Sequence, residues 1–445
     1  MASLNKLVTT KGRGLDLAAY ALLLFASVNL NGLFLLLLGT QGLLSPLILC
    51  LVLTLWIRYA RPRAVTGTYA LFVAFIGSYL IFASFANLSS SSFNETVFWI
   101  NLATLLLVSG LYFFLLVRTD AELESFLRVF KGFLIASCIL VLLTPILGDY
   151  LDYVAASDRA SGLFVNPNEA GIAALLSLVL IYAYPPRRKF MSFLQAAIAF
   201  SALALTFSKT GILTLTLLMA LVLLQKRSLW LSCLTIIIFA LAALALLYIS
   251  ESDLVHLTYD QRVRIADILS IFGGEISDQT TTGRTDLWAV GIQRILEQLP
   301  WGGGIGTFHA LEGTRRTVMY PDDSTRIMFG NWLGVHNAYL MVLGEAGLFP
   351  FLLLMCFFLR LFTNAFKVPE RTIAVPFGII ICMDMMASHG SLGFRLVDVA
   401  LAVMMAIAER PSLMSAQERK FSMLSSSAYP RSRAQETIFS TGIQE

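Results

Sequence analysis

Continuous apolar runs, most of them near the length that crosses a membrane as a helix, constrain this chain more than any other feature. Apolar residues make up 57% of its 445 residues and charged residues 13%, against about 45–50% and about 25% in soluble domains. A multidomain soluble protein is thereby excluded. The runs are 17–38, 42–57, 66–86, 97–117, 129–148, 170–184, 190–206, 211–224, 229–249, 347–365, 372–388 and 392–408. They predict an all-α polytopic membrane protein with about twelve transmembrane helices.

The distribution of Lys and Arg predicts the orientation, because cytoplasmic connections are enriched in both residues. With a cytoplasmic N-terminus, 22 of the 32 Lys and Arg residues fall in alternate connections and at the two ends of the chain. The short connections on the other side carry three, and one long external loop carries seven. We therefore expect both termini in the cytoplasm. The predicted segments are a cytoplasmic N-terminus at 1–16, nine helices in 17–249, the external loop at 250–346, three helices in 347–408 and a disordered cytoplasmic tail at 411–445.

The external loop has helical periodicity of its own. Apolar residues recur at helical spacing over 258–272 and 284–299, and the second stretch predicts an amphipathic helix that lies on the membrane surface or caps the bundle. The Gly-rich run 302–306 ends that helix and fits no dinucleotide fingerprint, so it is interpreted as a turn.

A third loop helix is predicted to begin near His336. At 100° per residue Tyr339 and Gly347 share the face of His336, and Glu345 lies opposite. This position makes His336 a candidate base, although a lone His is more often a satisfied surface or core residue.

Three basic residues stand out in the external connections: Arg159, Lys209 and Arg284. Arg284 begins the predicted helix 284–299, where a cation opposes the helix dipole unless an anion is bound there too. The three suggest a membrane-level site for phosphate groups, and the alternative is that each merely reaches lipid headgroups. No DxD or HExxH pattern occurs in the external loops, and the five cysteines lie inside apolar runs, so we expect no metal, no cofactor and no nucleic-acid partner.

Four motifs carry a resemblance to a known family. They are Arg159 with Phe-Val-Asn-Pro-Asn-Glu-Ala-Gly at 164–171, Ser-Lys-Thr-Gly-Ile-Leu at 208–213, Gly-Arg-Thr-Asp-Leu-Trp at 283–288 with the Pro-Trp-Gly-rich run 300–306, and His-Asn-Ala-Tyr-Leu with Gly-Glu-Ala-Gly over 336–347. In this order the chain resembles the O-antigen ligase and O-antigen polymerase superfamily of bacterial inner-membrane glycosyltransferases.

The resemblance implies about twelve helices, both termini inside, and a periplasmic loop before the last helices. It implies transfer of a glycan from undecaprenyl diphosphate, with His336 as the base and Arg284 and Lys209 as diphosphate ligands. The motif residues expected to support them are Gly283, Asn337, Tyr339 and Gly347.

The acceptor remains open between two types of enzyme. In ligases it is the lipid A-core of lipopolysaccharide, and in polymerases of O-antigen or exopolysaccharide it is another lipid-linked repeat unit. Ligases usually carry Arg where this chain has Lys209, and Gly where it has Pro350. Two other classes remain: a small-anion transporter, which the in-span Asp398 favours, and a non-catalytic scaffold.

Overall fold

The computed structural model describes residues 13–30, 32–34, 44–60, 65–89, 93–147, 159–164, 166–225, 259–273, 284–309, 311, 316–319, 325–328, 334–388, 390 and 393–410. Eleven of the twelve predicted apolar runs overlap a described helix. The predicted span 229–249 and the predicted tail 411–445 lie outside the described residues.

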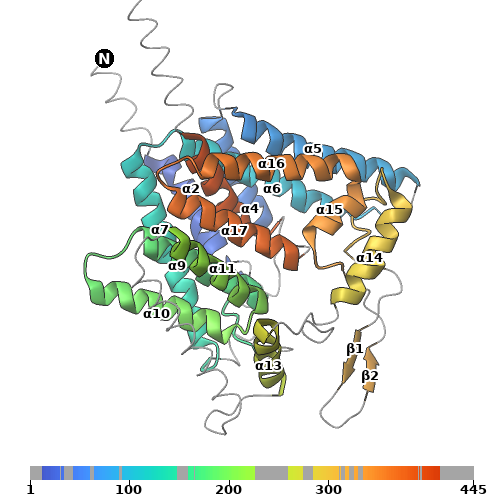
Figure 1. Ribbon diagram of the computed structural model, residues 1–445. Helices are drawn as coiled ribbons and strands as arrows, with labels where there is room; N and C mark the ends of the chain where they lie inside the picture. The colour runs from blue at the N-terminus through green and yellow to red at the C-terminus, as the bar shows by residue number, and fades with distance from the viewer. Residues whose placement is uncertain are drawn as a thin grey trace, which may run out of the picture.

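The described residues form a bundle of helices with one short hairpin (Figure 1). The helices are α2 (Arg13–Val28), α4 (Leu44–Tyr59), α5 (Gly67–Ala86), η2 (Asn87–Ser89), α6 (Glu95–Leu116), α7 (Asp120–Leu143), α9 (Pro167–Ala183), α10 (Lys189–Leu205), α11 (Lys209–Gln225), α13 (Tyr259–Gly273), α14 (Arg284–Gln298), α15 (Ala338–Ala346), α16 (Leu348–Ala365), α17 (Arg371–Ala387) and a final helix over 395–410. The strands β1 (Arg316–Met319) and β2 (Thr325–Met328) pair antiparallel.

By length and composition, four of the described helices could cross a membrane: α5, α6, α7 and α16. Several other described helices are equally apolar but shorter. The predicted class, a helical membrane protein, is therefore confirmed, and the count of twelve spans stays a prediction.

Polar residues at the ends of the apolar runs start the helices. Asn94 and Asn166 accept hydrogen bonds from the backbone N–H groups of Val97 and Asn168 at the starts of α6 and α9. Thr119 forms a reciprocal capping box with Glu122 at the start of α7. Such caps satisfy N–H groups that have no partner inside the helix.

The bundle packs α5 against both α6 and α16, and it packs α9 against α7, α10 and α17. Aromatic side chains such as Phe72, Phe75, Tyr79 and Phe377 fill the interior and are almost fully buried. α15 packs against α5, α16 and α14. The loop helices α14 and α15 therefore rest on one end of the bundle, at the C-terminal end of α5.

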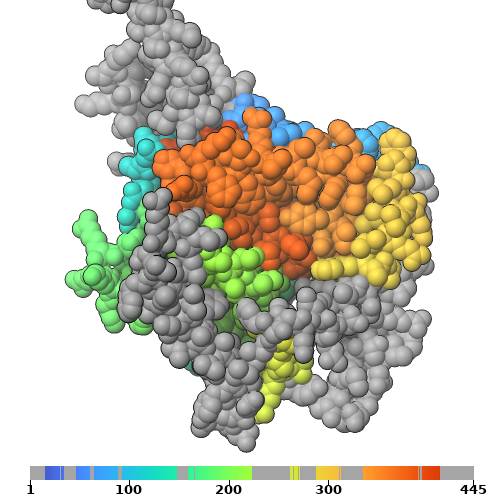
Figure 2. Space-filling view, in the orientation of Figure 1, coloured from blue at the N-terminus to red at the C-terminus, as the bar shows by residue number. Residues whose placement is uncertain are grey.

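Two loop helices were predicted correctly within a residue or two, namely α13 and α14. The hairpin was not predicted, because the sequence analysis assigned no element between the Gly-rich turn and His336. In Figure 1, α14 runs crosswise to α5 and α16 at their loop-side ends, and Figure 2 shows its yellow surface beside the orange surface of α16.

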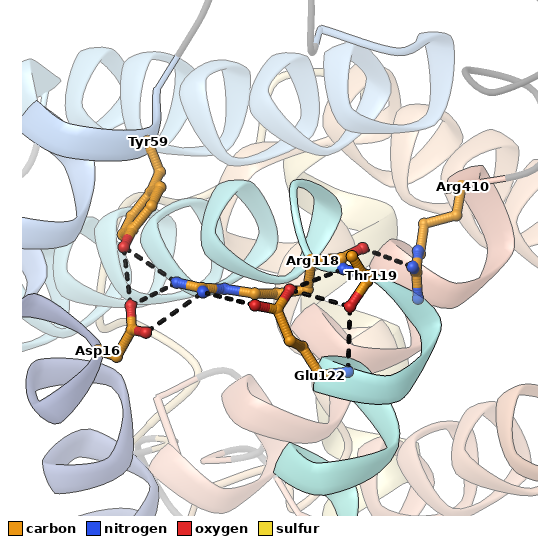
Figure 3. Close-up of polar contacts among 6 residues, drawn as sticks. All are labelled: Asp16, Tyr59, Arg118, Thr119, Glu122 and Arg410. Carbon is orange, nitrogen blue, oxygen red and sulfur yellow. Dashed lines mark hydrogen bonds and ion pairs between the residues drawn. The ribbon is translucent and has the colours of Figure 1, made fainter. Parts of the chain in front are cut away.

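The opposite end of the bundle is joined by a network around Arg118 (Figure 3). The Arg118 guanidinium lies 2.5 Å from Asp16 Oδ1 and donates to Tyr59 Oη at 2.9 Å. Arg410 in turn donates to the Arg118 carbonyl at 2.5 Å. Asp16 is in the first turn of α2 and Arg410 ends the final helix, so the first and last described helices have these ends on the same side of the bundle. The cytoplasmic placement of the two termini stays a prediction.

Candidate functional site

A cavity of about 80 Å³ lies at the loop-side end of the bundle, where four separate segments meet. Its polar lining includes Asn168 and Glu169 from the first turn of α9, and Ser208 and Thr210 at the start of α11. Further polar lining groups include His336, Asp384 near the end of α17, and Ser388 directly after α17. The predicted base is therefore brought together with the motif residues around Lys209 and with those that follow Arg159.

His336 occupies a backbone corner. It has φ +47°, a left-handed conformation in which His is enriched among non-glycine residues. Both neighbours are held: Val335 N–H donates to the Phe308 carbonyl at 3.0 Å, and the Asn337 side chain accepts from the N–H groups of Tyr339 and Leu340 at 3.0 and 3.1 Å. The prediction that the helix begins near His336 holds within two residues, since α15 begins at Ala338 and Asn337 caps it. The imidazole is therefore presented from a fixed corner before the helix.

Arg159 links two of the segments that line this cavity. Its Nε donates to the Thr206 carbonyl at 2.7 Å and its guanidinium also donates to Asn168 Oδ1 at 3.0 Å. Ser208 Oγ donates to the same Asn168 oxygen at 3.0 Å. These bonds tie the turn between α10 and α11 to the start of α9. They give Arg159 a structural role beside the cavity, and they leave its predicted contact with phosphate untested.

Lys209 lies next to the cavity-lining residues Ser208 and Thr210, and its ammonium forms an ion pair with Asp267 of α13 at 2.5 Å. The exposed fractions of the two side chains are 14% and 12%. The sequence analysis missed Asp267, which gave no local signal, because the two residues are 58 positions apart. The predicted diphosphate ligand is thus held by a carboxylate in this structure.

Arg284 begins α14, and its side chain, like Gly283, lies outside what the structure describes. The helix itself is placed by Trp288, one turn further on. The Trp288 indole N–H donates to the Val335 carbonyl at 3.0 Å. The N-terminal half of α14 is therefore held by a hydrogen bond to Val335, the residue before His336.

Two carboxylates share the cavity with His336. Glu169 and Asp384 both line it and interact electrostatically with each other. The sequence analysis quoted Glu169 only as part of a motif and did not single out Asp384. An acidic residue within or directly beside an apolar run is the sequence feature that could have identified both as candidate site residues.

Glu345, which the helical period places on the face opposite His336, has a structural role that the sequence analysis did not predict. Its exposed fraction is 0%, and its carboxylate accepts from Tyr79 Oη at 2.5 Å and from the Phe308 N–H at 3.1 Å. Burial raises the pKa of Glu345 to about 7. In the folded chain, α5 packs against α15 and the Gly-rich run 302–306 covers its end, so a residue on the face away from His336 is also buried.

The Gly-rich run wraps around the end of α15. Gly303 N–H donates to the Gly344 carbonyl at 2.7 Å, and Gly304 N–H donates to the Glu345 carbonyl at 3.0 Å. Gly347 has φ +80°, and a Cβ there would lie 2.1 Å from the Pro300 carbonyl oxygen. The run is therefore a turn, as predicted, and Gly347 permits the close approach of two backbone segments.

Among the residues that the structure describes, no group of three or more His, Cys, Asp or Glu side chains is arranged to hold a metal ion.

Comparison with known proteins gives one family. Residues 194–355 match the family model described as O-Antigen ligase, Wzy_C. No curated protein matches the chain. The matched segment begins within α10 and ends within α16, so it contains Lys209, α13, α14, the Gly-rich run and His336. The resemblance read from the motifs is thus confirmed, since this segment is similar to the O-antigen ligase family.

Proposed function

We propose that this protein is a metal-independent glycosyltransferase of the bacterial inner membrane that works on the periplasmic face. It moves a glycan from undecaprenyl diphosphate to a sugar hydroxyl of the lipid A-core, as an O-antigen ligase does. The observation that carries the proposal is the cavity in which His336 meets the starts of α9 and α11. His336 and the start of α11 lie inside the segment that matches the ligase family.

The reaction needs one proton acceptor and a stabilised leaving group. The acceptor hydroxyl oxygen bonds to the anomeric carbon while the bond from that carbon to the diphosphate oxygen breaks. His336 takes the hydroxyl proton, and the diphosphate leaves with the bonding electron pair. Lys209 and Arg284 stabilise the charge that develops on the diphosphate. In this role the two cations supply what a metal ion supplies in other glycosyltransferases.

The size of the cavity limits what it can hold. About 80 Å³ is well below the roughly 300–1,000 Å³ of typical ligand pockets. We therefore propose that the cavity receives only the reacting groups, and that the lipid and the rest of both glycans lie along the membrane surface outside it.

Polymerase activity is the second candidate function, and the lysine at position 209 is the observation that supports it. Lys209 keeps the positive charge of the arginine that ligases usually have at this position, but it cannot form the two parallel hydrogen bonds that a guanidinium forms with a phosphate. The transporter alternative rested on Asp398, whose carboxylate accepts hydrogen bonds from Thr104 and Arg395 at 3.3 Å each. These partners give the in-span acid a structural role, so the observation no longer favours transport.

The test is reconstitution of the purified full-length protein in liposomes with an undecaprenyl-diphosphate oligosaccharide. Lipid A-core and a second lipid-linked repeat unit are supplied in separate reactions. A glycosylated lipid A-core supports the ligase, and a lengthened lipid-linked glycan supports the polymerase. Failure of both acceptors, with the donor bound and the protein folded, would contradict glycosyl transfer.

A further inference from the structure

α14 has an inner face that packs against the rest of the external loop. Leu287 and Ile295 are buried on this face. Ile295 belongs to a small apolar cluster with Phe308, Val335 and Met341. This inner face already gives the helix the buried stripe that an amphipathic helix on a soluble domain requires.

The outer side of α14 carries a second apolar stripe that such packing does not explain. Ile292, Leu296 and Leu299 follow one another at i, i+4 and i+7, and all three are exposed, with Leu296 at 69%. Beside them runs a polar stripe in which Gln293 donates to Glu297 at 3.4 Å. Apart from the exposed Val290, which lies on the polar side, the exposed surface of the helix is therefore divided lengthwise into an apolar and a polar half.

The second apolar stripe continues into the outer surface of a membrane helix. Directly after α14, Trp301 is 68% exposed. Leu348 N–H donates to the Pro300 carbonyl at 3.0 Å, which fixes the end of α14 to the start of α16. On α16 the exposed side chains include Leu348, Phe349 and Leu352, and this helix is long and apolar enough to cross a membrane. Figures 1 and 2 show α14 lying crosswise at this end of α16 with the two surfaces adjoining.

We infer that α14 lies in the lipid leaflet on the loop side of the membrane, with Ile292, Leu296, Leu299 and Trp301 inserted among the lipids. A helix parallel to the membrane buries its apolar face about 5–10 Å into the boundary between headgroups and acyl chains. Trp is enriched at that depth. The continuity with α16 favours lipid over a second copy of the chain, because lipid already covers the neighbouring surface.

This placement has a consequence for the donor, which rests on the proposed function. Arg284 is the first residue of α14. An interfacial α14 holds it at the depth of the headgroups, where the diphosphate of a membrane-anchored donor lies. The insertion of the helix itself does not depend on which reaction the protein catalyses.

Photo-crosslinking of the full-length protein in phospholipid vesicles tests the insertion. The photoreactive residue p-benzoylphenylalanine is placed singly at Leu296 or Ile292, at the matched polar positions Gln293 or Glu297, and at Leu352 as the lipid-facing reference. After irradiation, mass spectrometry quantifies phospholipid adducts and gel electrophoresis detects joined protein copies.

We expect phospholipid adducts at 296 and 292 in yields near that at 352, and several times those at 293 and 297. Equal, low yields at all four α14 positions, in a protein that reacts fully at 352, would overturn the inference. A protein dimer crosslinked through 296 would overturn it in favour of a second copy. Because no activity is measured, these outcomes do not depend on the proposed function.

Discussion

The ammonium of Lys209 lies 2.5 Å from the Asp267 carboxylate, and this ion pair joins the start of α11 to the loop helix α13. Both side chains are largely removed from solvent. A cation predicted to bind the donor diphosphate therefore already has an anionic partner. A donor that uses Lys209 must compete with Asp267 for it.

Removing the charge of Asp267 should help the donor bind. For Asp267→Asn we expect the KM for the lipid diphosphate donor to fall by about fivefold, since an ion pair that solvent still reaches contributes roughly 1 kcal/mol. The measurement is initial rate against donor concentration in proteoliposomes. Asp267→Glu keeps the charge and serves as the control. A KM that rises in Asp267→Asn would mean that Asp267 positions Lys209 and does not compete for it.

Loss of the imidazole at His336 should abolish most turnover. A positioned base contributes about 10²- to 10⁴-fold in rate, so His336→Ala should lose kcat by about that factor while donor binding is kept. The rate of the natural protein should also fall as the pH is lowered and the imidazole is protonated. His309→Ala, which changes another His of the same loop, is the matched control and should be much milder. Near-normal kcat in His336→Ala at saturating donor and acceptor would exclude the base role.

The first residue of α14 should govern use of the donor. Hydrogen bonds to charged groups are worth about 1.5–3 kcal/mol, so Arg284→Ala should lower kcat/KM for the donor by about 10- to 100-fold. Arg284→Lys should recover part of the loss, and Lys209→Arg should be tolerated if charge alone suffices there.

Activity should also survive chelators, because cations take the place of a metal in the proposal. The assay is glycan transfer by the purified protein in excess chelator, followed by addition of Mg²⁺ or Mn²⁺. Strict dependence on the added metal would refute this part of the proposal.

Glu345 should position the loop rather than react. Glu345→Ala leaves the Phe308 N–H and the Tyr79 hydroxyl without their acceptor, at a cost of about 1–3 kcal/mol in the free energy of unfolding. Glu345→Gln keeps an acceptor and should stay close to the natural protein. Thermal unfolding in detergent measures both variants, with the exposed Glu297→Ala as the control. Equal loss in the Ala and Gln variants would show that the charge, and not the hydrogen bonding, is needed.

The same carboxyl predicts a pH dependence of stability. Burial raises the pKa of Glu345 from about 4.5 to about 7, so its protonated form is favoured in the folded state. The contribution of this group is fully present below about pH 4.5 and is lost as the pH rises through about 7. Over that range the unfolding temperature of Glu345→Gln should change less than that of the natural protein. Parallel curves would contradict the assignment.

Sidedness is open to a direct test. Reporter fusions near Ser228 and in the tail 411–445 should read as cytoplasmic, and fusions near Ser91 and within 250–335 should read as periplasmic. The expectation follows from the bias of Lys and Arg toward alternate connections. A cytoplasmic reading within 250–335 would place the cavity on the wrong face for the proposed reaction.

Local chemistry explains what was predictable. A backbone in lipid must satisfy its own hydrogen bonds, so an apolar run has to be a helix. The helix starts were less predictable: α7 begins at Asp120, capped by Thr119, nine residues before the predicted run 129–148. The helical period placed α13 and α14 within a residue or two. The hairpin β1–β2 escaped prediction because strands of four residues carry too little periodicity to be recognised.

The sequence by itself therefore determined the helical membrane class, the bias of charge along the chain, and the family to which the motifs belong. Only the tertiary structure decided which distant groups meet: Lys209 with Asp267, Tyr79 with Glu345, and His336 with Glu169 and Asp384 in one cavity. The physical reason is that periodicity reports which face of a helix is apolar. It does not report which neighbour covers that face, and for a charged side chain the neighbour decides between burial and exposure.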